Sequence, residues 1–174
     1  MGDFMEKGLV HIYTGDGKGK TTAAFGLAVR CASYGKKVVV YQFLKATPTG
    51  EICACEKLGI DVVRCAPTDK FWFDMTEEEK QQTKEKAKET LLHIYDQPCC
   101  LLVLDEVICL ADLGIISVQE LIDIVKNKPY STELVLTGRG MPEEITDFAD
   151  YVSEVKCIKH PYEKNIEARE GIEF

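Results

Sequence analysis

The chain has 174 residues, of which 45% are hydrophobic and 29% are charged, and this composition is typical of a globular protein rather than a disordered or fibrous one. Its formal net charge of −8 at pH 7 argues against nucleic acid or an anionic membrane surface as the main partner. The sequence contains no apolar run of the roughly 20 residues that a membrane-spanning helix needs. Residues 1–8 include Asp3, Glu6 and Lys7 and lack the apolar core of a signal peptide. We therefore expect a cytoplasmic protein with no nucleic-acid partner and no membrane partner.

The eight cysteines raise the question of a metal centre or of disulfides. They include no CxxC pair, and the CxC of Cys53 and Cys55 has no second pair of ligands at zinc-finger spacing. Cys99 and Cys100 lie within an apolar run, so we expect them to behave as small buried hydrophobic residues. The cysteines are predicted to be reduced thiols without a metal or redox role.

Strand-like segments recur along the whole chain. Short apolar runs rich in β-branched residues predict strands at 9–14, 38–43, 60–64, 101–104, 134–137 and 151–157. Runs that are apolar at nearly every position are typical of strands in a parallel sheet with both faces covered.

Helix signals lie between these strands. Apolar spacing of three and four residues predicts a helix over 20–34. A capping box of Thr76 and Glu79 opens a helix to about residue 95, and a second box of Ser117 and Glu120 opens another. Pro142 suits the first turn of a helix that runs to residue 149. In the helix after Thr76, the side chains expected to pack inward are Ala87, Leu91, Leu92 and Tyr95.

The most specific motif is the glycine-rich segment TGDGKGKTT at residues 14–22, which follows one predicted strand and opens one predicted helix. Its glycines allow successive backbone N–H groups to turn around phosphate oxygens, and the helix N-terminus adds its dipole. Lys20 supplies a positive charge, and the Thr21 hydroxyl can ligate Mg²⁺. Thr14 stands where the pattern G-x-x-x-x-G-K-[ST] has its first glycine, so the loop counted from Gly15 is one residue shorter. The residues predicted to bind the triphosphate are Gly15, Asp16, Gly17, Lys18, Gly19, Lys20, Thr21 and Thr22.

Together, the loop and the alternation of strands and helices predict an α/β fold of the P-loop NTPase-like type. We expect a three-layer sandwich with a mostly parallel sheet of six strands or slightly more. Right-handed crossovers place the strand-to-helix loops at one edge of such a sheet. A single domain is expected over residues 1–174, with 1–8 as a short N-terminal segment and 158–174 as a C-terminal tail.

Three charged residues follow strands that should end at the same edge as the loop. Asp105 and Glu106 come directly after the strand at 101–104, where acidic side chains can hold Mg²⁺ directly or through water. The alternative is an acidic pair at the start of a helix. Arg139, within TGRG after the strand at 134–137, can clamp a phosphate oxygen, or it can be a surface arginine in a tight turn.

Three consecutive aromatic residues, Phe71, Trp72 and Phe73, follow the strand at 60–64. Aromatic side chains on a loop often line an interaction site, because leaving them in water is unfavourable. The alternative is that they anchor the helix that follows in the core.

Several segments together resemble one known family, the ATP:corrinoid adenosyltransferases of the BtuR/CobO/CobP type. These segments are TGDGKGKTTAAFGLAVR (14–30), VVVYQFLK (38–45), KFWF (70–73), VLDE (103–106), ELVLTGRG (133–140) and HPYEKNIEAREGIEF (160–174). Thr14 belongs to the loop pattern of that family, whereas Asn165 stands where its members commonly have glycine.

The resemblance implies transfer of the 5′-deoxyadenosyl group of ATP to Co(I) of a reduced corrinoid, either cobalamin or a cobinamide-type precursor, with release of triphosphate. ATP is then a co-substrate, and Mg²⁺ or Mn²⁺ is the cofactor. Lys20, Thr21 and Arg139 would be the catalytic residues that stabilise the leaving triphosphate. By the same resemblance Thr21 and Glu106 would hold the metal with Asp105 nearby, and Arg30 would contact the adenine.

The resemblance also gives the aromatic loop a role. Related enzymes use two aromatic residues, separated by one residue, to displace the lower axial ligand of the corrinoid, which makes Co(II) easier to reduce. Phe71 and Phe73 have that spacing and Trp72 lies between them, so any two of the three could face the corrin ring. The family further suggests a homodimer and a reductase or flavodoxin-type electron donor.

Two other functions fit the residues taken alone. An ordinary P-loop ATPase or small-molecule kinase would transfer the γ-phosphoryl group, and it would need a group that positions water or acts as a base near that phosphate. A nucleotide-binding or corrinoid-carrier protein without enzymatic activity would not need Lys20 and Thr21 together with Asp105 and Glu106. The residues themselves do not distinguish adenosyl transfer from kinase chemistry.

Overall fold

A computed structural model describes residues 6–45 and 50–173. Within these residues, six parallel strands form one sheet in the order β3-β2-β4-β5-β1-β6. The strands are β1 (Val10–Thr14), β2 (Val38–Gln42), β3 (Asp61–Arg64), β4 (Leu101–Asp105), β5 (Glu133–Thr137) and β6 (Tyr151–Glu154). The predicted parallel sheet is confirmed, and each strand lies within a residue or so of its expected position except β6, which ends three residues early.

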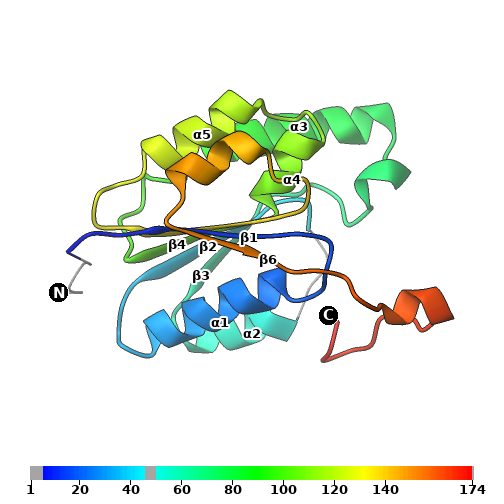
Figure 1. The fold of residues 1–174 in the computed structure, drawn as a ribbon, viewed down its shortest axis with the longest axis horizontal. Helices are drawn as coiled ribbons and strands as arrows, with labels where there is room; N and C mark the ends of the chain where they lie inside the picture. Colours follow the sequence, from blue (N-terminus) through cyan, green and yellow to red (C-terminus); the bar gives the residue numbers. More distant parts are fainter. Residues whose placement is uncertain (1–5, 46–49, 174) are drawn as a thin grey trace.

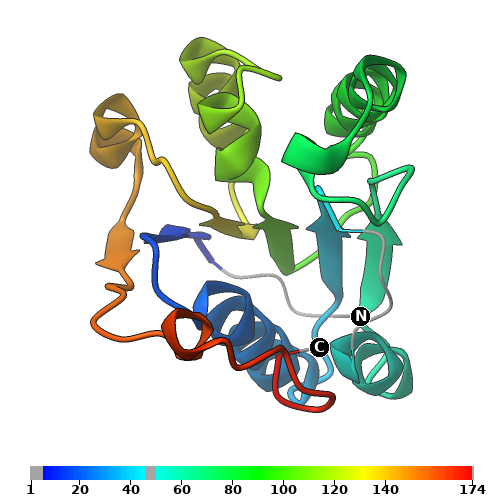
Figure 2. The ribbon, with the colours of Figure 1, turned by 90° about the vertical axis from the view of Figure 1, so that its right-hand side faces the viewer.

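Helices cover both faces of the sheet, so the molecule has the three layers that were predicted (Figure 1). One face carries α1 (Lys20–Ala32) and α2 (Gly50–Lys57). The other face carries α3 (Glu77–Leu91), α4 (Val107–Asp112), α5 (Val118–Lys126) and the 3₁₀ helix η2 (Glu143–Phe148). Figure 2 shows the sheet almost end-on between these two layers. Two further 3₁₀ helices, η1 (Trp72–Asp74) and η3 (Pro161–Lys164), lie in the loop after β3 and in the C-terminal segment.

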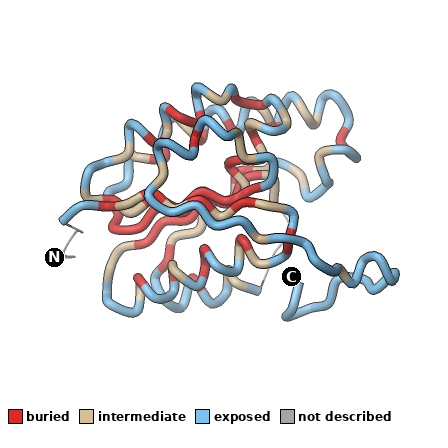
Figure 3. The backbone as a smooth tube through the Cα atoms, viewed as in Figure 1, coloured by how far each residue is buried: buried red, intermediate tan, exposed pale blue. Residues whose placement is uncertain are grey.

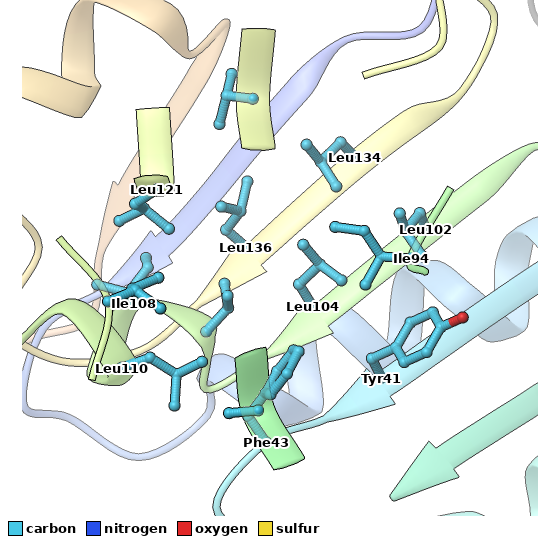
Figure 4. Close-up of a cluster of buried hydrophobic side chains, with 14 of the residues drawn as sticks. Tyr41, Phe43, Ile94, Leu102, Leu104, Ile108, Leu110, Leu121, Leu134 and Leu136 are labelled. Carbon is cyan, nitrogen blue, oxygen red and sulfur yellow. The ribbon is translucent and has the colours of Figure 1, made fainter. Parts of the chain in front are cut away.

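The central strand β4 shows why the apolar runs are continuous. All five of its residues are buried, because helices pack on both sides of it. Leu102 and Leu104 point into the core on the side of α4 and α5, whereas Leu101 and Val103 point into the core on the side of α1. Buried residues run through the middle of the molecule in Figure 3, and Figure 4 shows the larger of the two clusters between β2, β4, β5 and their covering helices.

The two predicted capping boxes are both present. Thr76 and Ser117 each accept a hydrogen bond from the backbone N–H three residues on, and the glutamate at that position bonds back to the cap. The helix opened by Thr76 ends at Leu91, however, and Leu92 is its C-cap with 80% of its surface exposed. The expectation that Leu92 packs inward is therefore wrong: Ala87, Leu91 and Tyr95 follow a spacing of four residues toward the core, and Leu92 lies about 100° around the helix from Leu91.

Other local details depart from the sequence-based expectations. The segment after Pro142 is a 3₁₀ helix, and Pro142 precedes it in extended conformation rather than lying in its first turn. Helix α2 was not predicted, and α4 corresponds to the alternative in which Asp105 and Glu106 stand at the start of a helix. The N-cap of α4, Glu106, has a left-handed backbone with φ of 63° and no side-chain capping bond, so this helix begins without any of the usual sequence signals.

After β6 the chain returns along the edge of the sheet where the strands end. Val155 O accepts a hydrogen bond of 2.7 Å from the N–H of Gly17, and Lys18 Nζ donates one of 3.1 Å to Ile172 O, so the C-terminal segment lies beside the glycine-rich loop (Figure 2). Asn165 has a φ of 55°, a left-handed backbone conformation that asparagine tolerates better than most residues with a side chain. In the part of the chain that the structure covers, no helix combines the length and apolar character needed to traverse a bilayer.

Candidate active site

Residues from four strands meet at one edge of the sheet. The glycine-rich loop follows β1, Lys45 lies just beyond β2, Glu106 follows β4, and Arg139 follows β5. In a parallel sheet these are the carboxyl ends of the strands, where α/β proteins bind their ligands. The structure thus brings together most of the residues that the sequence singled out.

The loop owes its shape to glycines at close contacts. Gly15 and Gly19 have φ of 96° and 120°, a conformation that residues with a side chain rarely adopt. A Cβ on Gly15 would lie 2.5 Å from Val155 O, and one on Gly17 would lie 2.8 Å from the same oxygen. The alternating glycines therefore let the loop pack directly against the chain that leaves β6.

Lys20, the first residue of α1, is the buried cation of the loop. Only 6% of its surface is exposed, and its Nζ donates a hydrogen bond of 2.9 Å to the carbonyl oxygen of Gly17. Burial lowers the pKa of Lys20, the negative charge of Glu106 acts in the opposite direction, and the positive charge of Arg139 lowers it further. A triphosphate at the loop would stabilise the charged form of this lysine.

Asp105 is fully buried at the end of β4, and both of its carboxylate oxygens are satisfied by hydrogen bonds. Its Oδ1 accepts from the hydroxyls of Thr21 at 2.9 Å and Thr137 at 2.8 Å. Its Oδ2 accepts from Lys45 Nζ at 2.9 Å and from Gln42 Nε2 at 3.3 Å. Asp105 is therefore placed to orient the Thr21 hydroxyl rather than to reach a ligand itself.

Glu106, by contrast, reaches toward the loop. Its φ of 63° is unfavourable for a non-glycine residue by about 1–3 kcal/mol, a strain that is common at functional sites. Its N–H donates to Thr137 Oγ1 at 2.9 Å, and its Oε2 accepts from the thiol of Cys109 at 2.9 Å. Its Oε1 lies 3.6 Å from Lys45 Nζ.

This donor set fits a hard divalent cation. The Thr21 hydroxyl and the Glu106 carboxylate are oxygen ligands of the kind that Mg²⁺ prefers, and a positively charged group, the Lys45 ammonium, already lies against both residues. Residues 6–45 and 50–173 contain no cluster of three or more His, Cys, Asp or Glu side chains that could hold a metal by itself. Triphosphate oxygens and water would therefore have to complete the coordination, as they usually do for Mg²⁺.

Arg139 lies in a turn that packs tightly on α4. Gly138 and Gly140 have φ of 149° and 65°, and a Cβ on either would lie within 2.8 Å of Ile108 or Asp112. The N–H of Arg139 donates to Cys109 Sγ at 3.2 Å, which fixes the backbone, while the side chain is exposed toward the loop edge. Its charge lowers the pKa of Lys20, so the two cations share one site.

Four residues predicted to bind ATP, three in the loop and Arg30 in α1, are exposed in the structure. The loop residues are Asp16, Thr22 and Lys18, and the side chain of Lys18 bonds to the C-terminal segment at Ile172 O. With a rise of about 1.5 Å per residue, the Cα of Arg30 lies about 15 Å along α1 from that of Lys20. The structure does not bring Arg30 to the loop, and its contact with adenine stays a prediction.

The three aromatic residues at 71–73 lie in two different environments. Phe71 and Phe73 are 81% and 85% exposed in the loop after β3, at the same edge as the triphosphate loop. Trp72 packs against the core, and the ammonium groups of Lys80 and Lys84 from α3 lie 5.9 and 5.8 Å from its ring centre. Trp72 anchors the following helix, whereas the two phenylalanines are free to contact a ligand.

Lys45, Gln42, Thr137 and Cys109 were not identified as site residues from the sequence. Lys45 and Gln42 belong to the segment VVVYQFLK, and Thr137 belongs to ELVLTGRG, both of which carry the family resemblance. A charged or polar residue at the carboxyl end of a buried parallel strand was the signal that could have found the first three. The bond of the Cys109 thiol to Glu106 has no such signal.

Comparison with known proteins assigns the chain to a family. Residues 6–174 match the family model described as ATP:corrinoid adenosyltransferase BtuR/CobO/CobP. A corrinoid adenosyltransferase of Sinorhizobium sp is 37% identical, with 97% of this chain and 81% of the relative covered. Corrinoid adenosyltransferase CobA of Salmonella typhimurium is 34% identical, and the corrinoid adenosyltransferase of Escherichia coli K12 is 32% identical, each with 97% of this chain and 87% of the relative covered. The chain therefore belongs to the family of ATP:corrinoid adenosyltransferases of the BtuR/CobO/CobP type.

Proposed function

We propose that this chain transfers the 5′-deoxyadenosyl group of ATP to Co(I) of a corrinoid and releases triphosphate, using the residues gathered at the carboxyl edge of the sheet. The observation that carries the assignment of the site is that Phe71 and Phe73 lie exposed at the same edge as the triphosphate loop. A site for a large apolar ring beside a site for a triphosphate suits this reaction.

The reaction requires that the enzyme stabilise the leaving group, triphosphate. The electron pair of Co(I) forms the bond to C5′ of the ribose, the C5′–O bond breaks, and its electrons leave with the triphosphate. Because Co(I) is itself the nucleophile, no side chain has to act as a general base. The residues must instead stabilise the charge that develops on the triphosphate, and this is the role of Lys20, Arg139 and the N–H groups of the loop.

Mg²⁺ or Mn²⁺, when bound, would add charge stabilisation on the triphosphate. Thr21 and Glu106 would hold it, since the oxygens of Asp105 are already occupied by hydrogen bonds. Asp105 would act through Thr21, because the proton of that hydroxyl is directed to Oδ1 and its lone pairs are then left for a cation.

Phe71 and Phe73 would cover the lower face of the corrin ring and exclude the axial ligand and water from the cobalt. Trp72 would hold the loop in place from the core side. The preparation of Co(I) from Co(II) would require an electron donor, a reductase or a flavodoxin-type protein. We also propose that the chain forms a homodimer. The proposals of the electron donor and of the homodimer both rest on the family resemblance.

The test is anaerobic incubation with MgATP and chemically reduced cobalamin, followed by identification of the phosphate product. Triphosphate together with the light-sensitive spectrum of an alkylcobalamin is the expected result. ADP and phosphate with an unchanged corrin spectrum would place the protein among ordinary P-loop ATPases and kinases. Incubation with cobinamide in place of cobalamin would then compare the complete and incomplete corrinoids.

A further inference from the structure

Lys45 lies against Thr21 and Glu106, the two residues proposed to hold the metal, and against Asp105, which orients Thr21. Its Nζ donates hydrogen bonds of 2.9 Å to Thr21 Oγ1 and 2.9 Å to Asp105 Oδ2, and it lies 3.6 Å from Glu106 Oε1. The side chain is 31% exposed, whereas that of Asp105 is completely buried. One ammonium group thus offsets part of the negative charge of two adjacent carboxylates and donates a hydrogen bond to a lone pair of the Thr21 hydroxyl.

The backbone before Lys45 takes an unfavourable conformation to place it there. Phe43 is fully buried, and its N–H continues the sheet by donating 3.0 Å to Asp105 O. Leu44 then has a φ of 58°, a left-handed conformation that is rare and unfavourable for a leucine. This left-handed residue turns the chain sharply at the end of β2. As a result, Lys45 approaches Asp105 and Glu106 instead of leaving the sheet in the direction of the strand.

A divalent cation would use the same oxygens. The Thr21 hydroxyl donates its proton to Asp105, so only its lone pairs are left for a positive partner, and the Lys45 ammonium takes one of them. Two positive charges that share this hydroxyl and the Glu106 carboxylate would repel each other strongly in a partly buried site. The ammonium and the metal therefore compete for one position.

We propose that Lys45 is a built-in counter-ion that alternates with the divalent cation at Thr21 and Glu106. It offsets part of the negative charge of Asp105 and Glu106 until the metal arrives with the triphosphate, and it then moves away from Thr21 and Glu106. Lys45 acts as a positioning residue, because it keeps the Thr21 hydroxyl and the two carboxylates arranged for a cation. This inference rests on the metal site of the proposed function and adds to it an ordered entry, in which metal binding without nucleotide is suppressed.

The test measures Mn²⁺ affinity of the full chain without nucleotide, by electron paramagnetic resonance. We expect Lys45→Met to bind Mn²⁺ at least about tenfold more tightly than the native chain, because the competing charge is gone while the oxygens remain. Lys45→Arg, which keeps the charge, should bind as weakly as the native chain. Lys37→Met is the matched control, since Lys37 pairs with Asp61 at the opposite edge of the sheet and its removal should change nothing. Equal Mn²⁺ affinity of Lys45→Met and the native chain would overturn the proposal.

A second measurement, by nuclear magnetic resonance, is made on the native chain. It therefore tests the proposal even if Lys45→Met does not fold. Lysines labelled with ¹³C at the ε carbon give separate signals, and the Lys45→Arg variant identifies that of Lys45. This signal should shift when Mg²⁺ and a non-hydrolysable ATP analogue are added together, and a signal that stays in place would overturn the proposal.

Neither experiment depends on adenosyl transfer, so the two proposals can fail separately. If Mn²⁺ binds to the native chain with the ATP analogue but Lys45→Met shows no gain, the role of Lys45 is wrong and the metal site stands. If the native chain with the analogue binds no Mn²⁺, the metal site itself is wrong and the role of Lys45 is overturned with it.

Discussion

The hydroxyl of Thr137, at the end of β5, donates a hydrogen bond of 2.8 Å to the buried Oδ1 of Asp105 at the end of β4. The same hydroxyl accepts the N–H of Glu106 at 2.9 Å. Thr137 thereby fixes the acidic pair of the site from the neighbouring strand, although it contacts no proposed ligand.

We expect Thr137→Val to lower the free energy of unfolding by about 1–3 kcal/mol, because it leaves the partly buried N–H of Glu106 without its acceptor and removes one donor from the buried Asp105. Urea denaturation measures this change. Thr146→Val is the control, since the side chain of Thr146 is exposed and its replacement should have little effect. A variant at Thr137 as stable as the native chain would contradict the role of the hydroxyl.

Lys20→Ala should reduce kcat/KM for adenosyl transfer by at least about 100-fold, because the leaving triphosphate loses a buried positive charge. Steady-state assay of alkylcobalamin formation measures it. Lys37→Ala, at the amino edge of the sheet, should retain full activity. Activity retained by Lys20→Ala would mean that the loop does not hold the triphosphate.

The aromatic residues should separate into two groups. Phe71→Ala and Phe73→Ala should slow the reaction that starts from Co(II) much more than the reaction of pre-reduced Co(I), without loss of stability, since both rings are exposed. Trp72→Ala should instead lower the free energy of unfolding by about 1–3 kcal/mol, because it removes a partly buried ring from the core. Thermal unfolding and the two assays distinguish these effects. Equal losses in both assays for the phenylalanine variants would show that the rings only bind the corrinoid.

Thiol labelling should follow burial. None of the eight cysteines, which all lie within the described residues, forms a disulfide, and Cys53 and Cys157 are exposed. Burial raises the pKa of Cys65 and Cys99 to about 11, so these thiols stay protonated and covered near neutral pH. We expect iodoacetamide at pH 7.5 to modify Cys53 and Cys157 first, as read by peptide mass spectrometry, and all eight to react in urea. Early modification of Cys65 or Cys99 would contradict the packing of the core.

The buried thiols also predict how stability depends on pH. Burial, with a contribution from Glu106, raises the pKa of Cys109 to about 12, from an ordinary value of 9.0. Above pH 9 the unfolded chain therefore loses thiol protons that the folded chain keeps, and the free energy of unfolding should fall as the pH rises from 9 toward 11. Thermal unfolding across this range measures the slope. The double variant Cys65→Ala and Cys99→Ala removes two other thiols with raised pKa values, so its free energy of unfolding should fall less steeply with pH. An unchanged slope would show that the buried thiols do not cause the pH dependence.

The sequence predicts the order of the elements well, because buried parallel strands and capping boxes have patterns of fixed period and spacing. It does not predict where a backbone turns left-handed at a residue other than glycine. Leu44 and Glu106 both do so, and these two turns place Lys45 and the Glu106 carboxylate in the site. Three adjacent aromatics are also equivalent in a sequence pattern. Only the packing of Trp72 beneath α3 shows that it differs from its neighbours.

The hydrogen bond from Gly17 to Val155 joins the phosphate loop near the start of the chain to the segment that follows the last strand. The shape of the loop therefore depends on Val155, a residue outside the glycine-rich motif. A chain cut before β6 would keep every residue of the triphosphate motif and lose the surface against which Gly15 and Gly17 are packed. The loop proposed to bind triphosphate reaches its full shape only when the final strand has joined the sheet, so we expect triphosphate binding to report that this strand has folded into place.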